Sequence, residues 1–278
     1  MQEVYLSLEK KIRKVWFLSL ENEDYFSYTE RVWISFLESV EIFGSFLEKF
    51  YMLVIKMTTN TKLLALLDTV IECYLDKGEP VGSKFLNSLE VVDYAPSTLR
   101  KYLNILEKQG MVYQPYNSSG RIPTLQWLSA YLDSTLAQKP DDIDLHLDSA
   151  RQELKSLVET LGEVADGVVV GFIRNDEYYY LGINNLLRDD MIDEYSATRT
   201  IIRFIEEKKI VAFIDKKILK QREVYYTFVN DQDTLISCVY VKISLDGYDM
   251  VLSIVGPLRV NYKKNITILK KVLESLGW

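Results

Sequence analysis

The chain has 278 residues and a net charge of -7 at neutral pH, and 48% of its residues are hydrophobic. That length suits two domains, and the composition is typical of a globular protein. The single histidine, His146, excludes a multi-histidine metal site and argues against a catalytic Ser/His/Asp or Cys/His set.

The two cysteines, Cys73 and Cys238, lie far apart and have no CxxC spacing. We therefore expect reduced thiols in a cytoplasmic protein rather than a disulfide or metal ligands. No segment has the roughly 20 consecutive apolar residues that a membrane span needs, and no signal peptide is evident. These features indicate a cytoplasmic protein with no membrane partner.

Residues 1–56 are rich in aromatic side chains, and apolar residues such as Val32, Phe36, Val40 and Phe43 recur at helical spacing. We expect one or two helices in this extension. Two explanations stay open: a native segment that packs on a partner, or an upstream stretch that precedes a true start at Met57.

The first predicted domain covers residues 57–139. Apolar residues between positions 63 and 74 recur with the period of a helix, and Gly78 is expected to follow its end. Ser83 is expected to cap a short second helix that runs through Leu89. A third helix is predicted over residues 95–109, because Pro96 suits a first helical turn.

Two short strands are predicted within residues 111–124, and the turn residues Asn117 to Gly120 between them are typical of a hairpin. Three helices followed by a hairpin are typical of a winged helix-turn-helix, in which the hairpin is the wing. A further helix through Trp127 and Leu132 leads into an acidic linker.

The third helix combines an apolar stripe of Leu99, Leu103 and Leu106 with a polar face. Arginine and lysine bond guanine edges or phosphates, asparagine pairs with adenine, and helix-start amides bind phosphate. A basic wing commonly lies on the backbone or in the minor groove. An ordinary solvated helix face would have the same periodicity. The candidate DNA-binding residues are Ser97, Thr98, Arg100, Lys101, Asn104 and Lys108 on the helix, and Ser118, Ser119, Gly120 and Arg121 on the wing.

The second predicted domain covers residues 140–278 and mixes strands with helices, which indicates an α+β fold with a mostly antiparallel sheet. Asn175 and Asp176 indicate a tight hairpin between its first two strands. The predicted strands cover residues 168–173, 178–183, 210–214, 224–229, 235–243 and 250–255, and the predicted helices cover 147–161, 192–207 and 265–276.

Signals for an enzyme are weak. The acidic pairs Asp141-Asp142 and Asp189-Asp190 are typical of solvated turns, and Gly256-Pro257 is typical of a turn after a strand. No glycine-rich loop of the kind that cradles phosphates is present. We therefore expect no catalysis, no metal and no cofactor.

The motifs of the first domain resemble those of the heat-inducible transcription repressors, the HrcA family. Residues 78–83 match the family's GEPVGS, residues 95–100 are similar to its SPATIR, and residues 114–124 are similar to its QPHTSAGRIPT wing. Lys101 stands where the family usually has asparagine, which implies a different operator preference. In the second domain, residues 256–262 resemble GPTRMDY and residues 182–187 resemble G-x-x-N-L-L.

The resemblance implies a winged helix-turn-helix followed by a truncated GAF-like α/β domain for regulation and dimerisation. It further implies a homodimer that represses chaperone operons through an inverted-repeat operator in double-stranded DNA, is released by heat stress and is modulated by the GroE chaperonin. The chain is short for this family, because the family's inserted dimerisation domain is missing between Ile173 and Tyr178.

A second interpretation belongs to another class of protein: a ligand-sensing or protein-binding GAF-like module whose winged helix no longer binds DNA specifically. Residues 57–139 carry 8 basic and 8 acidic side chains, a weak charge for a DNA-binding domain. This balance and the missing dimerisation insert favour the alternative.

Overall fold

The computed structural model describes residues 61–89, 94–141, 143, 145, 153–173, 177–187, 195–215, 220–245 and 248–276. The chain divides into two units, Met1–Thr59 and Asn60–Trp278. All described residues belong to the second unit, so the helices expected within residues 1–56 lie outside them, as does His146.

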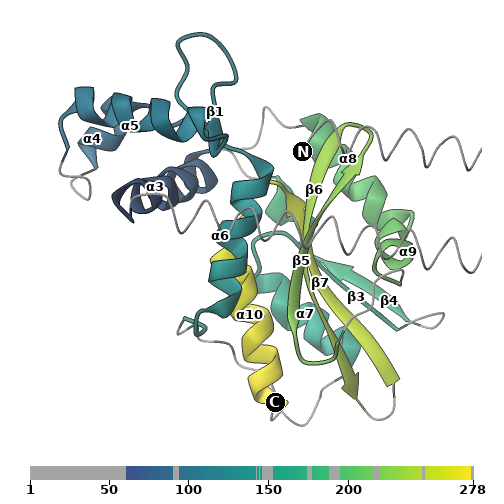
Figure 1. Ribbon diagram of the computed structural model, residues 1–278. Coiled ribbons are helices and arrows are strands. Elements are labelled where there is room, and N and C mark those ends of the chain that lie inside the picture. Colours follow the sequence, from purple (N-terminus) through teal and green to yellow (C-terminus); the bar gives the residue numbers. More distant parts are fainter. Residues whose placement is uncertain are drawn as a thin grey trace, which may run out of the picture. The chain divides into compact units, whose positions relative to one another are not determined.

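The N-terminal part of this unit, which we call the head, is built from helices and one short hairpin (Figure 1). Its elements in chain order are α3 (Thr61–Lys77), α4 (Ser83–Ser88), α5 (Pro96–Lys108), β1 (Val112–Tyr113), β2 (Ile122–Pro123) and α6 (Leu125–Ala137). The leucine stripe of α5 is buried, at 0% exposure for Leu99 and Leu106 and 4% for Leu103. It packs into the core that α3 and α6 complete.

Glycine residues lie at the end of α3 and at the start of α4. Gly78 follows α3 with a φ of +69° and its amide donates to the Tyr74 carbonyl at 2.8 Å, a common way for a helix to end. The expected capping role of Ser83 was wrong. Gly82 is the N-cap of α4, Ser83 is already helical, and no side chain caps this helix among the described residues.

The C-terminal part of the unit, the C-terminal domain, has a five-stranded antiparallel sheet in the order β4-β3-β7-β6-β5. Its fold is α+β with an antiparallel sheet, as the sequence predicted. The strands are β3 (Val168–Ile173), β4 (Tyr178–Leu181), β5 (Val224–Asp231), β6 (Thr234–Leu245) and β7 (Tyr248–Pro257), and the helices are α7 (Leu154–Val164), η2 (Ile183–Leu186, 3-10), α8 (Tyr195–Glu206), α9 (Lys209–Asp215) and α10 (Tyr262–Ser275).

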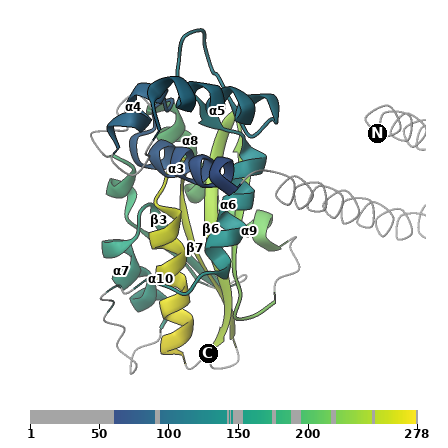
Figure 2. The ribbon, with the colours of Figure 1, turned by 60° about the vertical axis from the view of Figure 1, so that its left-hand side comes forward.

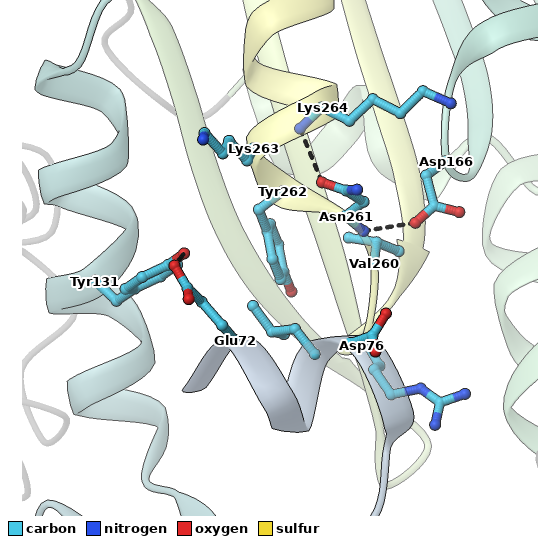
Figure 3. A pocket seen from close by; sticks show the side chains of 11 residues that line it. Glu72, Asp76, Tyr131, Asp166, Val260, Asn261, Tyr262, Lys263 and Lys264 are labelled. Atoms are coloured by element: carbon cyan, nitrogen blue, oxygen red, sulfur yellow. Dashed lines mark hydrogen bonds between the residues drawn. The ribbon is translucent and has the colours of Figure 1, made fainter. Parts of the chain in front are cut away.

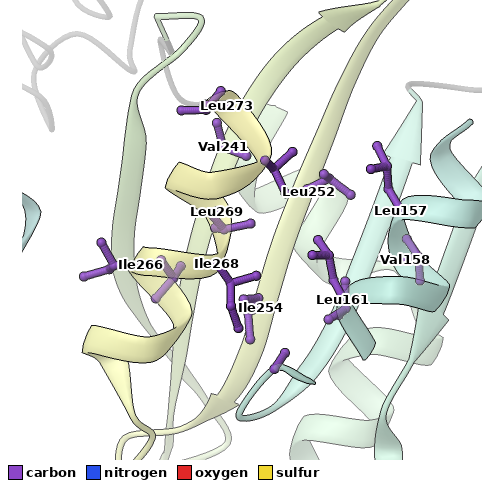
Figure 4. Packing of buried hydrophobic residues seen from close by; sticks show 14 of the residues in the cluster. Leu157, Val158, Leu161, Val241, Leu252, Ile254, Ile266, Ile268, Leu269 and Leu273 are labelled. Atoms are coloured by element: carbon purple, nitrogen blue, oxygen red, sulfur yellow. The ribbon is translucent and has the colours of Figure 1, made fainter. Parts of the chain in front are cut away.

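Both faces of the sheet are buried, because alternate residues of each central strand join different cores. In β6, Val239 and Val241 face α7 and α10, whereas Cys238 and Tyr240 face α8 and α9. Figure 4 shows the first core, in which aliphatic side chains of α10 and α7 meet those of β6 and β7. The sheet is therefore the centre of a three-layered domain.

The predicted strand over residues 210–214 was wrong, since these residues lie in α9. A short apolar run has no periodicity that separates a helix from a buried strand. Ile210 and Ile214, four residues apart, both face the sheet at 0% and 2% exposure. That spacing suits one face of a helix.

Other predicted boundaries differ in part. The helix predicted at 147–161 is α7, which begins at Leu154 because Glu153 is its N-cap with an extended backbone; residues 146–152 lie outside the described part. The strand predicted to end at 183 stops at Leu181, where Gly182 turns the chain with a φ of +96°. The first two strands of the sheet pair with Phe172 opposite Tyr178, but the proposed turn residues Asn175 and Asp176 are not among those described.

Candidate nucleic-acid interface

The outer face of α5 is polar and solvent-exposed. Three basic side chains on it, Arg100, Lys101 and Lys108, are exposed together with Ser97 and Asn104, while Thr98 is half-buried. Ala95 is the N-cap and Pro96 opens the helix, and within the described residues no side chain caps this end. The face therefore combines positive charge with a helix start that suits a phosphate.

The hairpin that follows α5 is tied to the chain segment before α4. Val81 and Arg121 form an antiparallel bridge in which each amide donates to the other's carbonyl at 2.8 Å. At Gly120 the backbones approach so closely that a Cβ atom would lie 2.3 Å from the Pro80 carbonyl oxygen. The two motifs of the head, residues 78–83 and 114–124, thus form one structural unit.

Arg121 faces α5, and its side chain is only 13% exposed. Its guanidinium donates through Nε to Glu107 Oε2 at 3.0 Å and through Nη2 to Asn104 Oδ1 at 3.1 Å. The structure therefore brings two of the predicted DNA-binding residues, Arg121 and Asn104, into one network on the helix. Glu107 was missed, although it lies three residues after Asn104 and so on the same helix face.

The tip of the hairpin is held by its own backbone and side chains. Ser119 donates from its amide to the Tyr116 carbonyl at 3.1 Å and from Oγ to the Gly120 carbonyl at 3.0 Å. Ser118 is exposed and has a positive φ of 67°. Tyr113 and Tyr116, at 46% and 64% exposure, flank this tip and were not predicted as site residues. Aromatic residues in a predicted wing were the signal for them.

A second feature lies where the head meets the C-terminal domain. A cavity of about 350 Å³ opens between α3, α6 and the start of α10 (Figure 3). Tyr131 of α6 donates to Glu72 of α3 at 3.3 Å across it. Burial and the nearby Glu72 carboxylate raise the pKa of Tyr131 above its ordinary value, so this phenol stays protonated at neutral pH.

The C-terminal motif around residues 256–262 builds the other wall of that cavity. Asn261 caps α10 by accepting from the Lys264 amide at 2.9 Å, and its own amide donates to Asp166 at 2.5 Å. Tyr262 is buried and its hydroxyl donates to the Leu258 carbonyl. These contacts give the motif a structural role.

The motif at residues 182–187 also has a structural role. The side-chain amide of Asn185 lies 3.0 to 3.2 Å from the carbonyl oxygens of Gly162, Ala165 and Gly167. Asn185 thereby ties the 3-10 helix η2 to the chain that leaves α7 and enters β3. A short carboxamide fits this position because it donates twice without carrying charge.

Comparison with known proteins shows the family of this chain. The family model described as "HrcA protein C terminal domain" matches residues 103–266, more than half of the chain. The chain belongs to the HrcA family. The match begins within α5, at residue 103, and continues through the hairpin and the sheet to the start of α10.

Several relatives are named heat-inducible transcription repressor HrcA. The one from Xylella fastidiosa (strain M12) is 32% identical over 136 residues, which are 46% of this chain and 39% of that protein. The one from Lachnoclostridium phytofermentans is 22% identical over 230 residues, 80% of this chain and 63% of that protein. The HrcA-family chain thus spans less than two thirds of the length of these relatives.

A solved structure shares the fold. The crystal structure of a hypothetical protein at 2.2 Å resolution superposes with a TM-score of 0.64 at 14% identity, covering 79% of this chain and 98% of that one. At that identity the similarity shows the fold alone. None of the described helices is long and apolar enough to cross a membrane.

Proposed function

We propose that this HrcA-family chain is a transcriptional repressor whose head, over residues 57–139, is a winged helix-turn-helix that binds double-stranded DNA. The observation that carries the proposal is the exposed basic face of α5, with Arg100, Lys101 and Lys108, beside a rigid hairpin. In this mode α5 enters the major groove and the hairpin lies on the adjacent backbone. The names of the relatives support repression of heat-shock operons.

The ten candidate residues divide into two roles in this proposal. Ser97, Thr98, Arg100, Lys101 and Lys108 contact the DNA, and Ser118, Ser119 and the Gly120 backbone meet a phosphate at the wing. Arg121 and Asn104 act by holding the wing against α5, because their polar groups already bond each other and Glu107. Asn104 stays exposed and retains its amide nitrogen for a base edge.

The operator is proposed to be an inverted repeat upstream of chaperone operons, which calls for two heads in a homodimer. In this proposal the C-terminal region, residues 140–278, is GAF-like and carries the dimer contact, residues 1–56 are an extension, and the protein acts in the cytoplasm. The GroE chaperonin is the proposed modulator. Catalysis has no part in this mechanism.

The test is a salt-dependent mobility shift on double-stranded DNA from upstream of chaperone operons, with a shuffled sequence of equal length as control. The three exposed cations of α5, counted over two heads, can neutralise at most six phosphates. Binding through all six should weaken about 10³-fold between 50 and 200 mM salt. Equal affinity for both DNA sequences, or no binding at the lower salt, contradicts the proposal.

One observation favours the second candidate function, a ligand-sensing module. The cavity of about 350 Å³ lies beside the head and within the size range of small-molecule sites. Its lining is strongly charged, since it includes Glu72, Asp76, Arg259 and Lys264, whereas ligand sites are mostly apolar. The basic face of α5 is therefore the stronger basis for a function.

A further inference from the structure

A residue of the C-terminal domain donates a hydrogen bond to the carbonyl end of helix α3. Arg259 donates through Nη1 to the Lys77 carbonyl oxygen, the last residue of α3, at 2.7 Å. Its guanidinium lies directly over Gly78, where a Cβ atom would be only 1.3 Å from Nη1. Arg259 is 9% exposed, so its charge is held away from water in this position.

The end of helix α6 is completed in the same way. Lys270 of α10 donates through Nζ to the carbonyl oxygens of Leu136 and Gln138, at 2.6 and 2.5 Å. Burial lowers the pKa of Lys270 from its ordinary value. Tyr226 of β5 adds a third contact, since its hydroxyl lies 2.9 Å from the Ser129 carbonyl and 3.0 Å from Asp133.

These contacts share one physical basis. The last four carbonyl groups of a helix have no partner within it, and the helix dipole makes that end favourable for a cation. Here the two cations come from the C-terminal domain: Arg259 precedes α10, and Lys270 lies in the second half of that helix. The helices that receive them are the first and the last of the head. Figure 2 shows α3 across the start of α10, with α6 beside it.

We propose that Arg259 and Lys270 are positioning residues that clamp the head in one orientation on the C-terminal domain. Because α5 lies between the two clamped helices in the chain, the clamp fixes the direction in which its basic face points. Only the role of that direction in DNA binding rests on the proposed function. Loss of both contacts removes these donors from the ends of α3 and α6 and loosens the orientation of the head, while Leu132 of α6 stays packed in the core of the sheet.

A double-label distance measurement tests the clamp without DNA. Spin labels are placed on exposed positions of the head and the C-terminal domain, by Lys84→Cys in α4 and Glu159→Cys in α7, with Cys73→Ser. The unaltered clamp should give one narrow distance distribution. Arg259→Met/Lys270→Met should at least double its width, and Arg259→Lys, which keeps the donor, should give less broadening than Arg259→Met. Arg199→Met, a matched change of an exposed arginine on α8, should leave the width unchanged.

Circular dichroism at the same temperature shows whether each variant is folded, so that broadening through general unfolding is recognised by lost helix signal. A folded double variant with the distribution of the unaltered protein overturns the clamp. On DNA with two half-sites at increasing separation, the folded double variant should lose at least five-fold of the preference for one separation. If the unaltered protein binds none of these DNAs, the proposed function fails, while the distance measurement still decides the clamp.

Discussion

The head and the C-terminal domain distribute their apolar and polar residues in different ways. The C-terminal domain buries apolar side chains on both faces of its sheet, and its sequence motifs form caps and turns, with Arg259 reaching the end of α3 in the head. The head buries the leucine stripe of α5, and its motif residues divide between inward contacts such as Arg121–Glu107 and outward groups such as Arg100. The motifs of the C-terminal domain therefore have structural roles, whereas those of the head also include groups that can bind a partner.

The largest effect is expected in the core of the C-terminal domain. Leu269 of α10 is fully buried against the sheet, so Leu269→Ala should lower the free energy of unfolding by about 2–5 kcal/mol. Leu187→Ala, at a side chain that is 61% exposed, should change it by less than about 0.5 kcal/mol. Urea denaturation measures both. Similar losses in the two variants would show that this core does not dominate stability.

A smaller but more local effect is expected at the hairpin of the head. Gly120→Ser places a Cβ atom against the Pro80 carbonyl, which should cost about 1–3 kcal/mol through overpacking and weaken DNA binding. Gly82→Ser is the matched control, because a Cβ there meets no described atom within 4 Å and serine is a good N-cap. Thermal unfolding and the mobility shift give the two readouts. Equal behaviour of the variants contradicts the close approach of the backbones.

Removal of the ion pair between Arg121 and Glu107 should have a modest effect on stability and a separate effect on DNA affinity. Arg121→Ala should lower stability by about 1 kcal/mol, since Glu107 is 35% exposed and water screens the pair. DNA affinity should fall, because the wing is no longer held on α5, but the slope of affinity against salt should stay constant. A slope that decreases by about one phosphate contact would show that Arg121 touches DNA directly.

Periodicity predicted most of the fold for identifiable reasons. The leucine stripe of α5 buries one face of that helix, and β3 and β7 are nearly continuous apolar runs that are buried on both faces of the sheet, so both patterns in the sequence mark the core. Residues 210–214 contain five apolar residues in a row, and only the sheet that they pack against distinguishes α9 from a strand.

Contacts between residues that lie far apart along the chain could not be predicted from the sequence. The sequence predicts that Arg121 is an exposed basic residue. In the fold, its guanidinium instead donates to Glu107 and Asn104. Arg259 and Lys77 are 182 residues apart, and no local pattern predicts that one completes the helix of the other. The exposed face of α5 could be predicted, because it depends only on the helix and its buried stripe.

The measurement that tests the central claim most directly is the affinity of Arg100→Ala and Lys101→Ala for double-stranded operator DNA, determined by fluorescence anisotropy. Both side chains are exposed on α5, opposite the buried leucines. Each variant should keep its thermal unfolding midpoint and lose about 1–3 kcal/mol of binding free energy. Lys155→Ala, an exposed lysine on α7, should bind like the unaltered protein. Undiminished affinity in both α5 variants would contradict the assignment of this face to DNA.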